Sequence, residues 1–508
     1  MPTTLVWFKR DLRVHDHAPL AAAAARGAVL PVFLLEPGYW AQPDVSARHW
    51  QVLRPALLEL RGALGGLGQP LLLRAGEACA VLEALHAQQP FDAVHAHEET
   101  GNGWTFARDR AVAAWCRARG IAFRQWRQFG VVRGLKRRQH WVRQWEGLMA
   151  EAQIPAPSAL TPLGLEPGAL PEWPPGLNAP TPVPVLQAAG RASALRCLDG
   201  FLHRRGEHYS REMSSPLSAA RACSRLSTHL AWGCLSLREA VHAARGRAAE
   251  LKALPKDQRG QWPRALASFE SRLHWHCHFI QKLETEPAIE FHNVNRGYDG
   301  LRESDFDAMR FEAWASGHTG WPFVDACMRA LVHTGWLNFR MRAMLVAIAA
   351  WQLWLHWRQP GLHLARCFND YEPGIHYSQV QMQSGVTGIN IPRMYSPVKQ
   401  SLDQDPDGVF IRRWVPELAA VPAPWIHEPW KMGSAQQQRY GLKLGRDYPL
   451  PLLDHAQAAR EARARLAEWR RSQPELSRLN REVLERHGSR RRRVEQRAAP
   501  ASPQGELF

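Results

Sequence analysis

The eight cysteines of this 508-residue sequence include no pair in CxxC spacing, and none of them follows Cys367. Scattered cysteines favour neither a zinc site nor a disulfide framework, and they are typical of a reducing cytoplasm. The sequence also shows no secretory signal, because Met1 leads directly into the strand-like TTLVWF and the charged KRDLR. We therefore predict a cytoplasmic protein.

Long hydrophobic runs are missing as well. The most apolar segment, at positions 343–357, is bounded by Arg342 and Arg358. A helix needs about 20 apolar residues to span a bilayer, which is more than this segment offers. We therefore predict a buried core helix here and no membrane partner.

Acidic residues are few relative to basic ones. Lysine and arginine number 64 against 47 aspartates and glutamates, which gives a net charge of +17. Such an excess favours a polyanionic partner, most simply nucleic acid, although charge alone does not identify it. The hydrophobic content of 45% is ordinary for a globular protein, and the length suits two or three domains.

The N-terminal part of the chain, up to Gly130, alternates short apolar strands with helical stretches. The strand-like segments are TTLVWF, AVLPVFLLE, PLLLRAG, FDAVHAHEE and IAFRQW. This rhythm predicts an α/β domain at 1–130 with a doubly wound parallel sheet. The first strand is followed by KRDLRVHDH instead of a GxGxxG turn, so a conventional dinucleotide-binding half is not expected.

Three further regions follow this domain. Ten prolines between Pro155 and Pro184 interrupt regular structure, and we predict a Pro-rich connector at 131–190. Helical periods then dominate, as in SLREAVHAAR, which opens with a capping box from Ser236 to Glu239. We predict an all-α C-terminal domain at 191–455 and a basic, partly disordered tail at 456–508, whose first part can be helical.

The segment ACSRLSTHLAWG at 222–233 gathers hydrogen-bond donors at the start of an apolar helical pattern. A helix N-terminus presents free N–H groups and partial positive charge, so Ser224, Arg225 and Ser227 would complete an anion site suited to phosphate. The alternative is that one of the two serines only caps the helix.

Four motifs in order resemble the photolyase/cryptochrome flavoproteins over roughly residues 1–430. They are LVWFKRDLRVHDH, CSRLSTHLAWGCLS, GHTGWPFVDACMRALVHTGWLNFRMR and PDGVFIRRWVPEL. The resemblance implies an α/β domain of the antenna-bearing type and a helical domain that binds FAD. It further implies a deoxyribodipyrimidine photolyase, in which light-excited reduced FAD passes an electron to a pyrimidine dimer in damaged DNA.

The resemblance also implies the residues that bind FAD. They are Tyr209, Ser224, Arg225, Leu226, Ser227, Arg272, His276, Asn338, Arg342, Asp370, Tyr371 and Glu372. Asp370 is expected to pair with Arg342 under the flavin ring; an acidic surface turn is the alternative. The sequence departs from the family pattern at His276, where many members have arginine, and at Arg272, where dimer-specific enzymes often have glutamate. GIHYSQVQMQSG replaces an Asn- and Trp-rich segment, so the neighbour of flavin N5 stays unassigned.

For the substrate pocket, the resemblance implies Trp275 and Trp336 as aromatic walls, with Arg340 beside them as a catalytic residue. Arg393 and Lys399 are expected to contact DNA. Stacking is worth about 1–3 kcal/mol per base, which would offset much of the cost of flipping the dimer out. Core packing is the alternative for both tryptophans.

A metal site is not expected. His274, His276 and His278 lie two positions apart, and on a helix successive members would point about 200° apart. The absence of cysteines after Cys367 also excludes the iron–sulfur branch of the family.

The sequence favours cyclobutane dimers because Leu-Asn-Phe-Arg follows Trp336, where enzymes for the six-four photoproduct need histidine chemistry. The alternatives are a six-four photolyase, a cryptochrome-like photoreceptor or a basic nucleic-acid-binding module without flavin. An antenna of folate or deazaflavin type would lie near HEETGNGW at 97–104, with no residue assigned to it. We expect a monomer.

Many members of the family reduce their flavin through three tryptophans, and this sequence keeps only the middle position, Trp357. Trp351, Trp354 and Trp357 nevertheless recur every three residues, a step of about 4.5 Å on one helix. We predict a replacement electron path through these rings, joined to FAD by Tyr377 or Tyr395. A tryptophan-rich core helix is the alternative.

Overall fold

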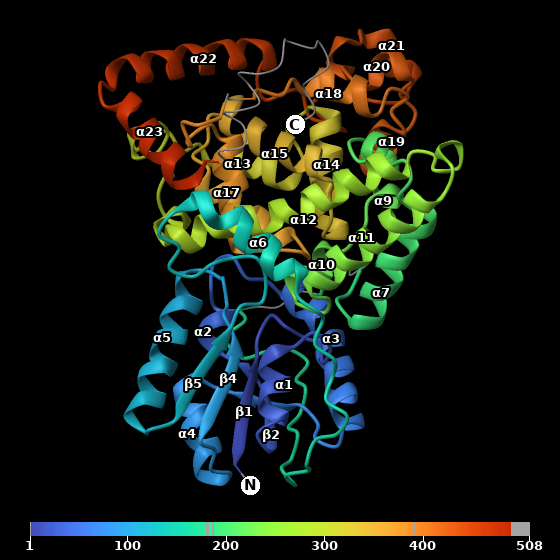
Figure 1. Cartoon of the computed structure of the whole chain (residues 1–508). Coiled ribbons are helices and arrows are strands. Elements are labelled where there is room, and N and C mark those ends of the chain that lie inside the picture. Colours follow the sequence, from blue (N-terminus) through green and yellow to red (C-terminus); the bar gives the residue numbers. More distant parts are fainter. Residues whose placement is uncertain (1, 179–181, 185–186, 391–392, 489–508) are drawn as a thin grey trace.

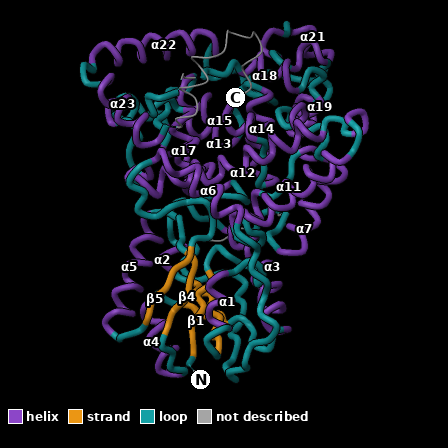
Figure 2. Tube along the Cα trace, viewed as in Figure 1, coloured by secondary structure: helices purple, strands orange, loops and turns teal. Residues whose placement is uncertain are grey.

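The computed structural model describes residues 2–178, 182–184, 187–390 and 393–488. An α/β domain forms one end of the molecule and a larger helical domain the other (Figure 1). The predicted fold class is confirmed, and all strands of the described chain lie in the N-terminal domain (Figure 2).

Five parallel strands make the sheet in the order β3-β2-β1-β4-β5. The strands are β1 (Thr3–Phe8), β2 (Ala28–Leu35), β3 (Leu72–Ala75), β4 (Ala93–His97) and β5 (Ala122–Trp126). The helices between them are α1 (Ala18–Ala24), α2 (Pro37–Trp40), α3 (Ala47–Gly66), α4 (Ala78–Gln88) and α5 (Gly103–Ala118).

Both faces of the sheet are covered by helices, as a doubly wound sheet requires. Val6 and Phe8 of β1 pack with the core under α1 and α3, whereas Leu5 and Trp7 face the core under α4 and α5. The side chains of one strand alternate between the two cores because successive Cβ atoms of a strand point to opposite faces.

The helical domain is built from eighteen helices of the described chain. These are α6 (Trp141–Ala150), α7 (Arg191–Gly200), α8 (Tyr209–Glu212), α9 (Pro216–Ala222), α10 (Ser227–Ala231), α11 (Leu237–Ala253), α12 (Trp262–Thr285), α13 (Ala308–Ser316), α14 (Pro322–Thr334), α15 (Phe339–Trp351), α16 (Arg358–Cys367), α17 (Pro373–Gln383), α18 (Pro397–Gln404), α19 (Val409–Trp414), α20 (Ala423–Ile426), α21 (Ser434–Arg439), α22 (His455–Ser472) and α23 (Leu476–His487). The capping box predicted at Ser236 and Glu239 is confirmed at the start of α11.

The segment predicted as a connector starts with regular structure, because its residues 141–150 form α6. Trp141 and Trp145 of this helix pack into the core of the helical domain. The described residues from 151 to 190 form neither helix nor strand, and the Leu160 N–H donates to Leu67 O at the end of α3 at 2.6 Å. The domain limits stay a prediction.

Part of the predicted tail is helical. Leu466 of α22 and Val483 of α23 join the main core of the helical domain. Residues 489–508, which include the arginine run at 490–493, lie outside the described residues.

The helix expected over residues 343–357 ends earlier than predicted. α15 stops at Trp351, Trp354 adopts a left-handed backbone with φ of 56°, and α16 begins at Arg358. A left-handed residue terminates a helix, so the three tryptophans at 351, 354 and 357 do not share one helix. The segment is buried, as predicted.

Two further observations concern the whole described chain. None of its helices has the length and apolarity needed to cross a bilayer. All eight cysteines are free.

Candidate functional site

A cavity opens between α15, α16 and α17 in the helical domain. The space between protein atoms there, together with the open solvent at its edge, is about 610 Å³. Its lining residues are Phe339, Arg342, Ala343, Val346, Leu364, Phe368, Asp370, Tyr371, Glu372, Ile375, His376, Gln379, Val380 and Gln383. α17 is held close to α12, because a Cβ on Gly374 would lie 2.6 Å from Ile280 Cα. Four predicted FAD contacts, Arg342 and residues 370–372, therefore line one cavity.

The predicted pair of Arg342 and Asp370 is confirmed. The guanidinium donates to both carboxylate oxygens of Asp370, with each distance 2.9 Å. Asp370 is buried and also accepts a hydrogen bond from the Ser227 hydroxyl. Burial opposes ionisation, but the pair and these hydrogen bonds lower the pKa of Asp370 below its ordinary value. The carboxylate is charged at neutral pH.

The donor segment 224–227 reaches the same carboxylate through Ser227. A helix begins at Ser227, as predicted, but it ends at Ala231, so its dipole is small. Leu226 is the N-cap residue and no side chain caps this helix, so the reading of a serine as a cap is wrong. Arg225 has a left-handed backbone with φ of 63°, and its guanidinium covers the Trp336 ring at 3.9 Å.

Arg10 in the loop after β1 holds the acidic loop at 370–372. Its guanidinium donates to the carbonyls of Tyr371 and Ala231, and it lies 3.5 Å from the Glu372 carboxylate. Burial raises the pKa of Glu372, although Arg10 opposes the shift. The sequence reading missed Arg10, which lies in the motif KRDLR but is separated from Ala231 and Tyr371 by 221 and 361 positions along the chain.

Asp44 of the α/β domain supports the acidic loop from the same side. Its Oδ2 accepts hydrogen bonds from the hydroxyl groups of Tyr371, at 2.5 Å, and Tyr377, at 3.3 Å. The ring of His49 stacks on Tyr371 at 5.6 Å. Burial and the Asp44 charge raise the pKa of Tyr371 well above its ordinary value, so this phenol is neutral. No sequence signal singled out Asp44 or His49.

One of the three predicted substrate residues, Trp275, is linked to a cavity residue through Arg272. The Arg272 guanidinium is 4.3 Å from the Trp275 ring and 5.6 Å from the ring of Phe339, a half-exposed cavity residue. Arg340 is part-exposed, two residues along α15 from Arg342. Arg272 and Trp275 therefore lie next to Phe339 of the cavity, and the roles of Trp275, Trp336 and Arg340 in binding substrate stay a prediction.

Other predicted FAD contacts lie further from the lining. The Asn338 amide donates to Met213 O at 3.1 Å and Ser214 O at 2.6 Å, while its Oδ1 is buried without a partner in the described chain. Tyr209 forms a hydrogen bond with the Arg272 side chain. The His276 ring contacts Phe129, and burial lowers the pKa of His276 to about 4.

The two predicted DNA contacts are on the surface. Arg393 is exposed, and exposed Lys399 lies 3.1 Å from the Asp403 carboxylate. Neither residue lines the cavity.

The tryptophans of the predicted electron path differ in their surroundings. The buried Arg302 guanidinium lies 4.7 Å from the Trp351 ring and 4.5 Å from the Trp354 ring. In the described chain, no guanidinium or ammonium group lies over the Trp357 ring. The indole N–H of Trp357 donates to Asn293 Oδ1 at 2.8 Å, and the centre of its ring is 6.3 Å from that of Tyr377. Tyr395 is partly buried against the main core of the helical domain.

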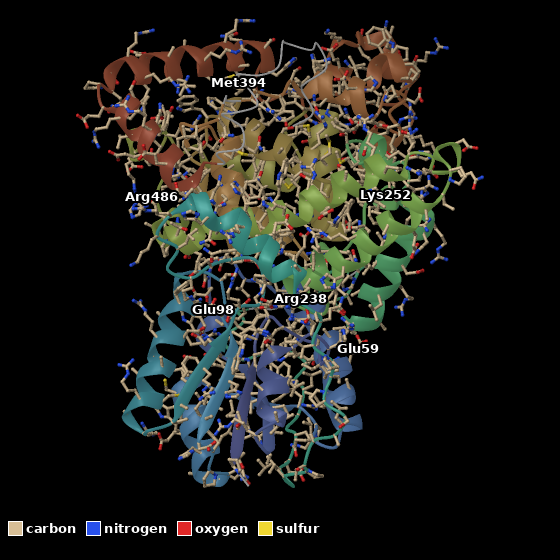
Figure 3. All side chains as sticks on the ribbon, in the orientation of Figure 1. Glu59, Glu98, Arg238, Lys252, Met394 and Arg486 are labelled. Carbon is tan, nitrogen blue, oxygen red and sulfur yellow. The ribbon has the colours of Figure 1, made fainter. Side chains whose placement is uncertain are left out.

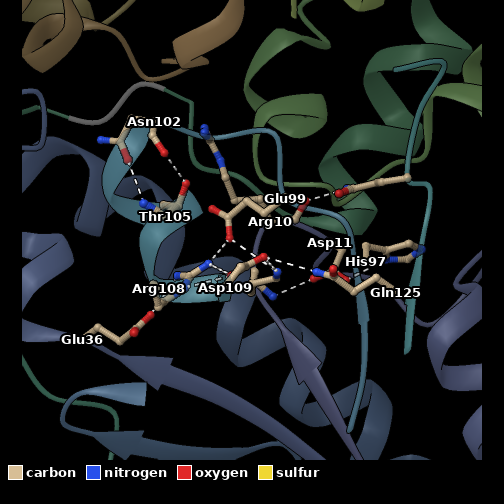
Figure 4. Close-up of polar contacts among 12 residues, drawn as sticks. Arg10, Asp11, Glu36, His97, Glu99, Asn102, Thr105, Arg108, Asp109 and Gln125 are labelled. Atoms are coloured by element: carbon tan, nitrogen blue, oxygen red, sulfur yellow. Dashed lines mark hydrogen bonds and ion pairs between the residues drawn. The ribbon is translucent and has the colours of Figure 1, made fainter. Parts of the chain in front are cut away.

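The sheet ends in a buried ion cluster where a doubly wound fold commonly binds a ligand. Arg108 contacts Glu99, and it bonds Glu36 and Asp109 at 2.8 Å each (Figure 4). Lys9 adds a 2.8 Å bond to Asp109. Three carboxylates here face two cations, and burial raises the pKa of Glu36 to about 7.

Asp11, His17 and His97 form the one group in the described chain that could hold a metal ion. Asp11 Oδ2 is 3.0 Å from His17 Nε2 and 2.7 Å from His97 Nδ1. His17 Nδ1 accepts the Leu20 N–H at the start of α1, so its Nε2 carries the proton and donates to Asp11. These hydrogen bonds account for the cluster without an ion.

Polar contacts also join the two domains around the site. Arg238, labelled at the boundary between them in Figure 3, donates to the Asp16 carboxylate and to Glu151 Oε2 at 3.0 Å. On the other side, Glu290 Oε2 accepts the Gly103 N–H at 2.6 Å.

Glu290→Gln is expected to stabilise the fold at high pH. Burial raises the pKa of Glu290 from 4.5 to about 7. Its stability contribution is therefore complete below pH 4.5 and is lost as the pH rises through 7. Glutamine keeps an acceptor for Gly103 but does not ionise, so the free energy of unfolding should rise by about 2 kcal/mol at pH 8 and change little at pH 4. Urea unfolding at both pH values measures this, and equal effects at both would contradict it.

Two family models match the chain. One, described as DNA photolyase, matches residues 4–132, and the other, described as the FAD binding domain of DNA photolyase, matches residues 269–468. The cavity and its acidic loop lie within the second range.

Similar proteins cover nearly the full length. Cryptochrome DASH of Gloeobacter violaceus is 30% identical over 484 residues, which are 90% of this chain and 94% of that protein. Deoxyribodipyrimidine photo-lyase of Agrobacterium fabrum is 28% identical over 492 residues, which are 91% of this chain and 97% of that protein. The crystal structure of a class III photolyase from Agrobacterium tumefaciens has a TM-score of 0.79 at 25% identity, covering 93% of this chain and 98% of that one.

The residues of the cavity fit the cofactor that the second family model names. Arg342 lines the cavity, and Arg225 and the Ser227 hydroxyl lie near Asp370, so the cationic and donor groups that an anionic diphosphate needs are close together. Phe368, Val346 and Leu364 supply apolar walls for a flat ring. This lining and the relatives that cover nearly the whole chain place the protein in the photolyase/cryptochrome family of flavoproteins, with its FAD-binding domain in the helical part.

Proposed function

We propose that this chain is a light-driven, FAD-dependent DNA photolyase that splits cyclobutane pyrimidine dimers. The observation that carries the proposal is the cavity of Arg342 and Asp370, which Phe339 also lines, with Arg272 packed between the Phe339 and Trp275 rings. When bound, FAD supplies the light-driven electron chemistry, and the protein supplies binding and orientation.

The mouth of the cavity is suited to a base flipped out of DNA. Arg272 and Arg225 cover one face of the Trp275 and Trp336 rings, so we propose that a base stacks on the other face. Arg340 offers a guanidinium that can bind phosphate or base oxygens. The net charge of +17 supplies the sequence-independent attraction to DNA, with exposed Arg393 and Lys399 as proposed contacts.

The histidine that lines the cavity, His376, favours cyclobutane dimers over six-four photoproducts. Burial lowers the pKa of His376 to about 4, so this ring is neutral at pH 7. A neutral imidazole with such a pKa is a poor source of a proton, whereas the six-four reaction is expected to need histidine acid chemistry.

A cryptochrome-like photoreceptor is the second candidate. The observation in its favour is the 30% identity to a protein named Cryptochrome DASH. A photoreceptor would bind FAD and respond to light without repairing dimers, so a repair assay separates the two functions.

The test is repair of dimer-containing DNA under blue light, with a dark control. We expect light-dependent repair by the wild-type protein. Trp336→Ala should lower the preference for damaged over intact DNA about tenfold, because a stacked base contributes about 1–3 kcal/mol. Flavin-loaded protein without repair would favour the photoreceptor, and unchanged discrimination in Trp336→Ala would assign that ring to core packing.

For photoreduction of FAD, we propose that Trp357 and Tyr377 carry the electron. A nearby positive charge disfavours electron loss, and Arg302 lies against both Trp351 and Trp354. Trp357→Phe should therefore slow photoreduction with an external donor several-fold, and Trp354→Phe should slow it less. Time-resolved absorbance measures both rates, and wild-type rates in both variants would leave these rings purely structural.

A further inference from the structure

Gln379 carries a buried carboxamide that nothing in the described chain satisfies. The residue lies on α17 and lines the cavity of Arg342 and Asp370. Both its Nε2 and its Oε1 are shielded from solvent and have no hydrogen-bond partner. Buried amides are nearly always hydrogen-bonded, so a pair of orphan atoms at a cavity wall indicates a partner in the cavity.

The neighbouring glutamine shows that α17 can satisfy such a group where the protein surrounds it. Gln381 Nε2 donates to Ile289 O and His292 O at 2.8 Å each, and its Oε1 accepts the Val294 N–H at 2.6 Å. Gln381 does not line the cavity. The orphan amide is thus restricted to the face of α17 that lines the cavity.

That face also carries His376. Its Nε2 lies 2.8 Å from Gly361 O, and a carbonyl only accepts, so Nε2 holds the proton and Nδ1 is an acceptor. Residues 376, 379, 380 and 383 recur at helical spacing along the same wall. The wall therefore combines an acceptor with a group that both donates and accepts.

We propose that the Gln379 carboxamide hydrogen-bonds the isoalloxazine ring of FAD. The inference rests on the proposed binding of FAD in this cavity. The polar edge of the ring carries carbonyl oxygens and an N–H, which a carboxamide can match with its own donor and acceptor. Phe368, Val346 and Leu364 provide the apolar surroundings that a flat tricyclic ring requires. Adenine presents a similar donor and acceptor edge, so the experiment must separate the two ends of the cofactor.

The test replaces Gln379 with leucine, which nearly keeps the size of the side chain and removes both polar atoms. Gln438→Leu, on the surface helix α21, is the matched control. We expect Gln379→Leu to weaken FAD binding about fivefold to tenfold, to shift the visible absorption band of the flavin and to change its two-electron midpoint potential. Each tenfold difference between the affinities for oxidised and reduced FAD equals about 30 mV. The control should match the wild-type protein in all three measurements.

Each outcome decides the assignment. Weaker FAD binding with unchanged absorption and potential would place the carboxamide at the adenine and overturn the proposal, as would a variant identical to wild type. If Gln379→Leu does not fold, Gln379→Met removes both polar atoms from a side chain of similar length, and the same shifts are expected. Wild-type protein that binds no FAD would overturn the proposed function itself, whereas unchanged spectra in a flavin-loaded variant would overturn only the role of Gln379.

Discussion

Asp370→Ala is expected to lose most of its FAD during purification. The substitution removes a buried carboxylate that holds Arg342 through two 2.9 Å bonds and accepts from Ser227. Removing one partner of a fully buried pair costs roughly 3–5 kcal/mol, and the cost is lower here because the Arg342 side chain is 24% exposed. If half of that energy were lost from cofactor binding, the affinity for FAD would fall by about tenfold to sixtyfold.

The flavin content per protein, measured by absorbance after gel filtration, checks this expectation. Asp403→Ala is the matched control, since Asp403 pairs with the exposed Lys399 and lies outside the cavity. Asp370→Asn should retain more FAD than Asp370→Ala, because the amide oxygen still accepts hydrogen bonds. Full occupancy in Asp370→Ala would remove Asp370 from the cofactor site.

Arg108→Met is expected to destabilise the α/β domain by about 3–5 kcal/mol. Arg108 is buried, and it contacts three carboxylates at the end of the sheet: Glu36, Glu99 and Asp109. Its pKa is raised well above the ordinary value by these neighbours, although burial opposes the charge. Without the guanidinium, Lys9 alone faces them, and the carboxylates repel one another in a medium of low dielectric.

Urea unfolding followed by tryptophan fluorescence measures the loss. Arg119→Met is the control, because Arg119 follows the same helix, α5, and pairs with the exposed Glu83. Exposed pairs contribute little to stability, so the control should stay close to wild type. Equal stability of the two variants would mean that the ion cluster of Figure 4 is not a structural element.

Local sequence patterns predicted much of the fold. The alternation of apolar strands with helices predicted the parallel sheet, and the capping box at Ser236 and Glu239 predicted the start of α11. These features depend on residues a few positions apart, so they are readable in the chain. The pairing of Arg342 with Asp370 was also predicted, but from the resemblance to a family and not from local spacing.

The sequence could not reveal contacts between distant segments. Arg10 and Asp44 hold Tyr371 of the acidic loop from the α/β domain, at separations of 361 and 327 positions along the chain, and no local pattern marks them. The same limit explains the wrong helix at 343–357: its periodicity is helical, but Trp354 turns the backbone where Arg302 packs against its ring.

By itself, the sequence determined the order of elements, the excess of positive charge and the donor-rich segment at 224–227, since each is a property of composition or of near neighbours. Only the tertiary structure decided which of these groups meet. It brought Ser227 to Asp370, placed a cluster of ion pairs at the end of the sheet and left the Gln379 amide unsatisfied at the cavity wall. The physical reason is that hydrogen bonding and ion pairing act over a few ångströms of space, whatever the distance along the chain.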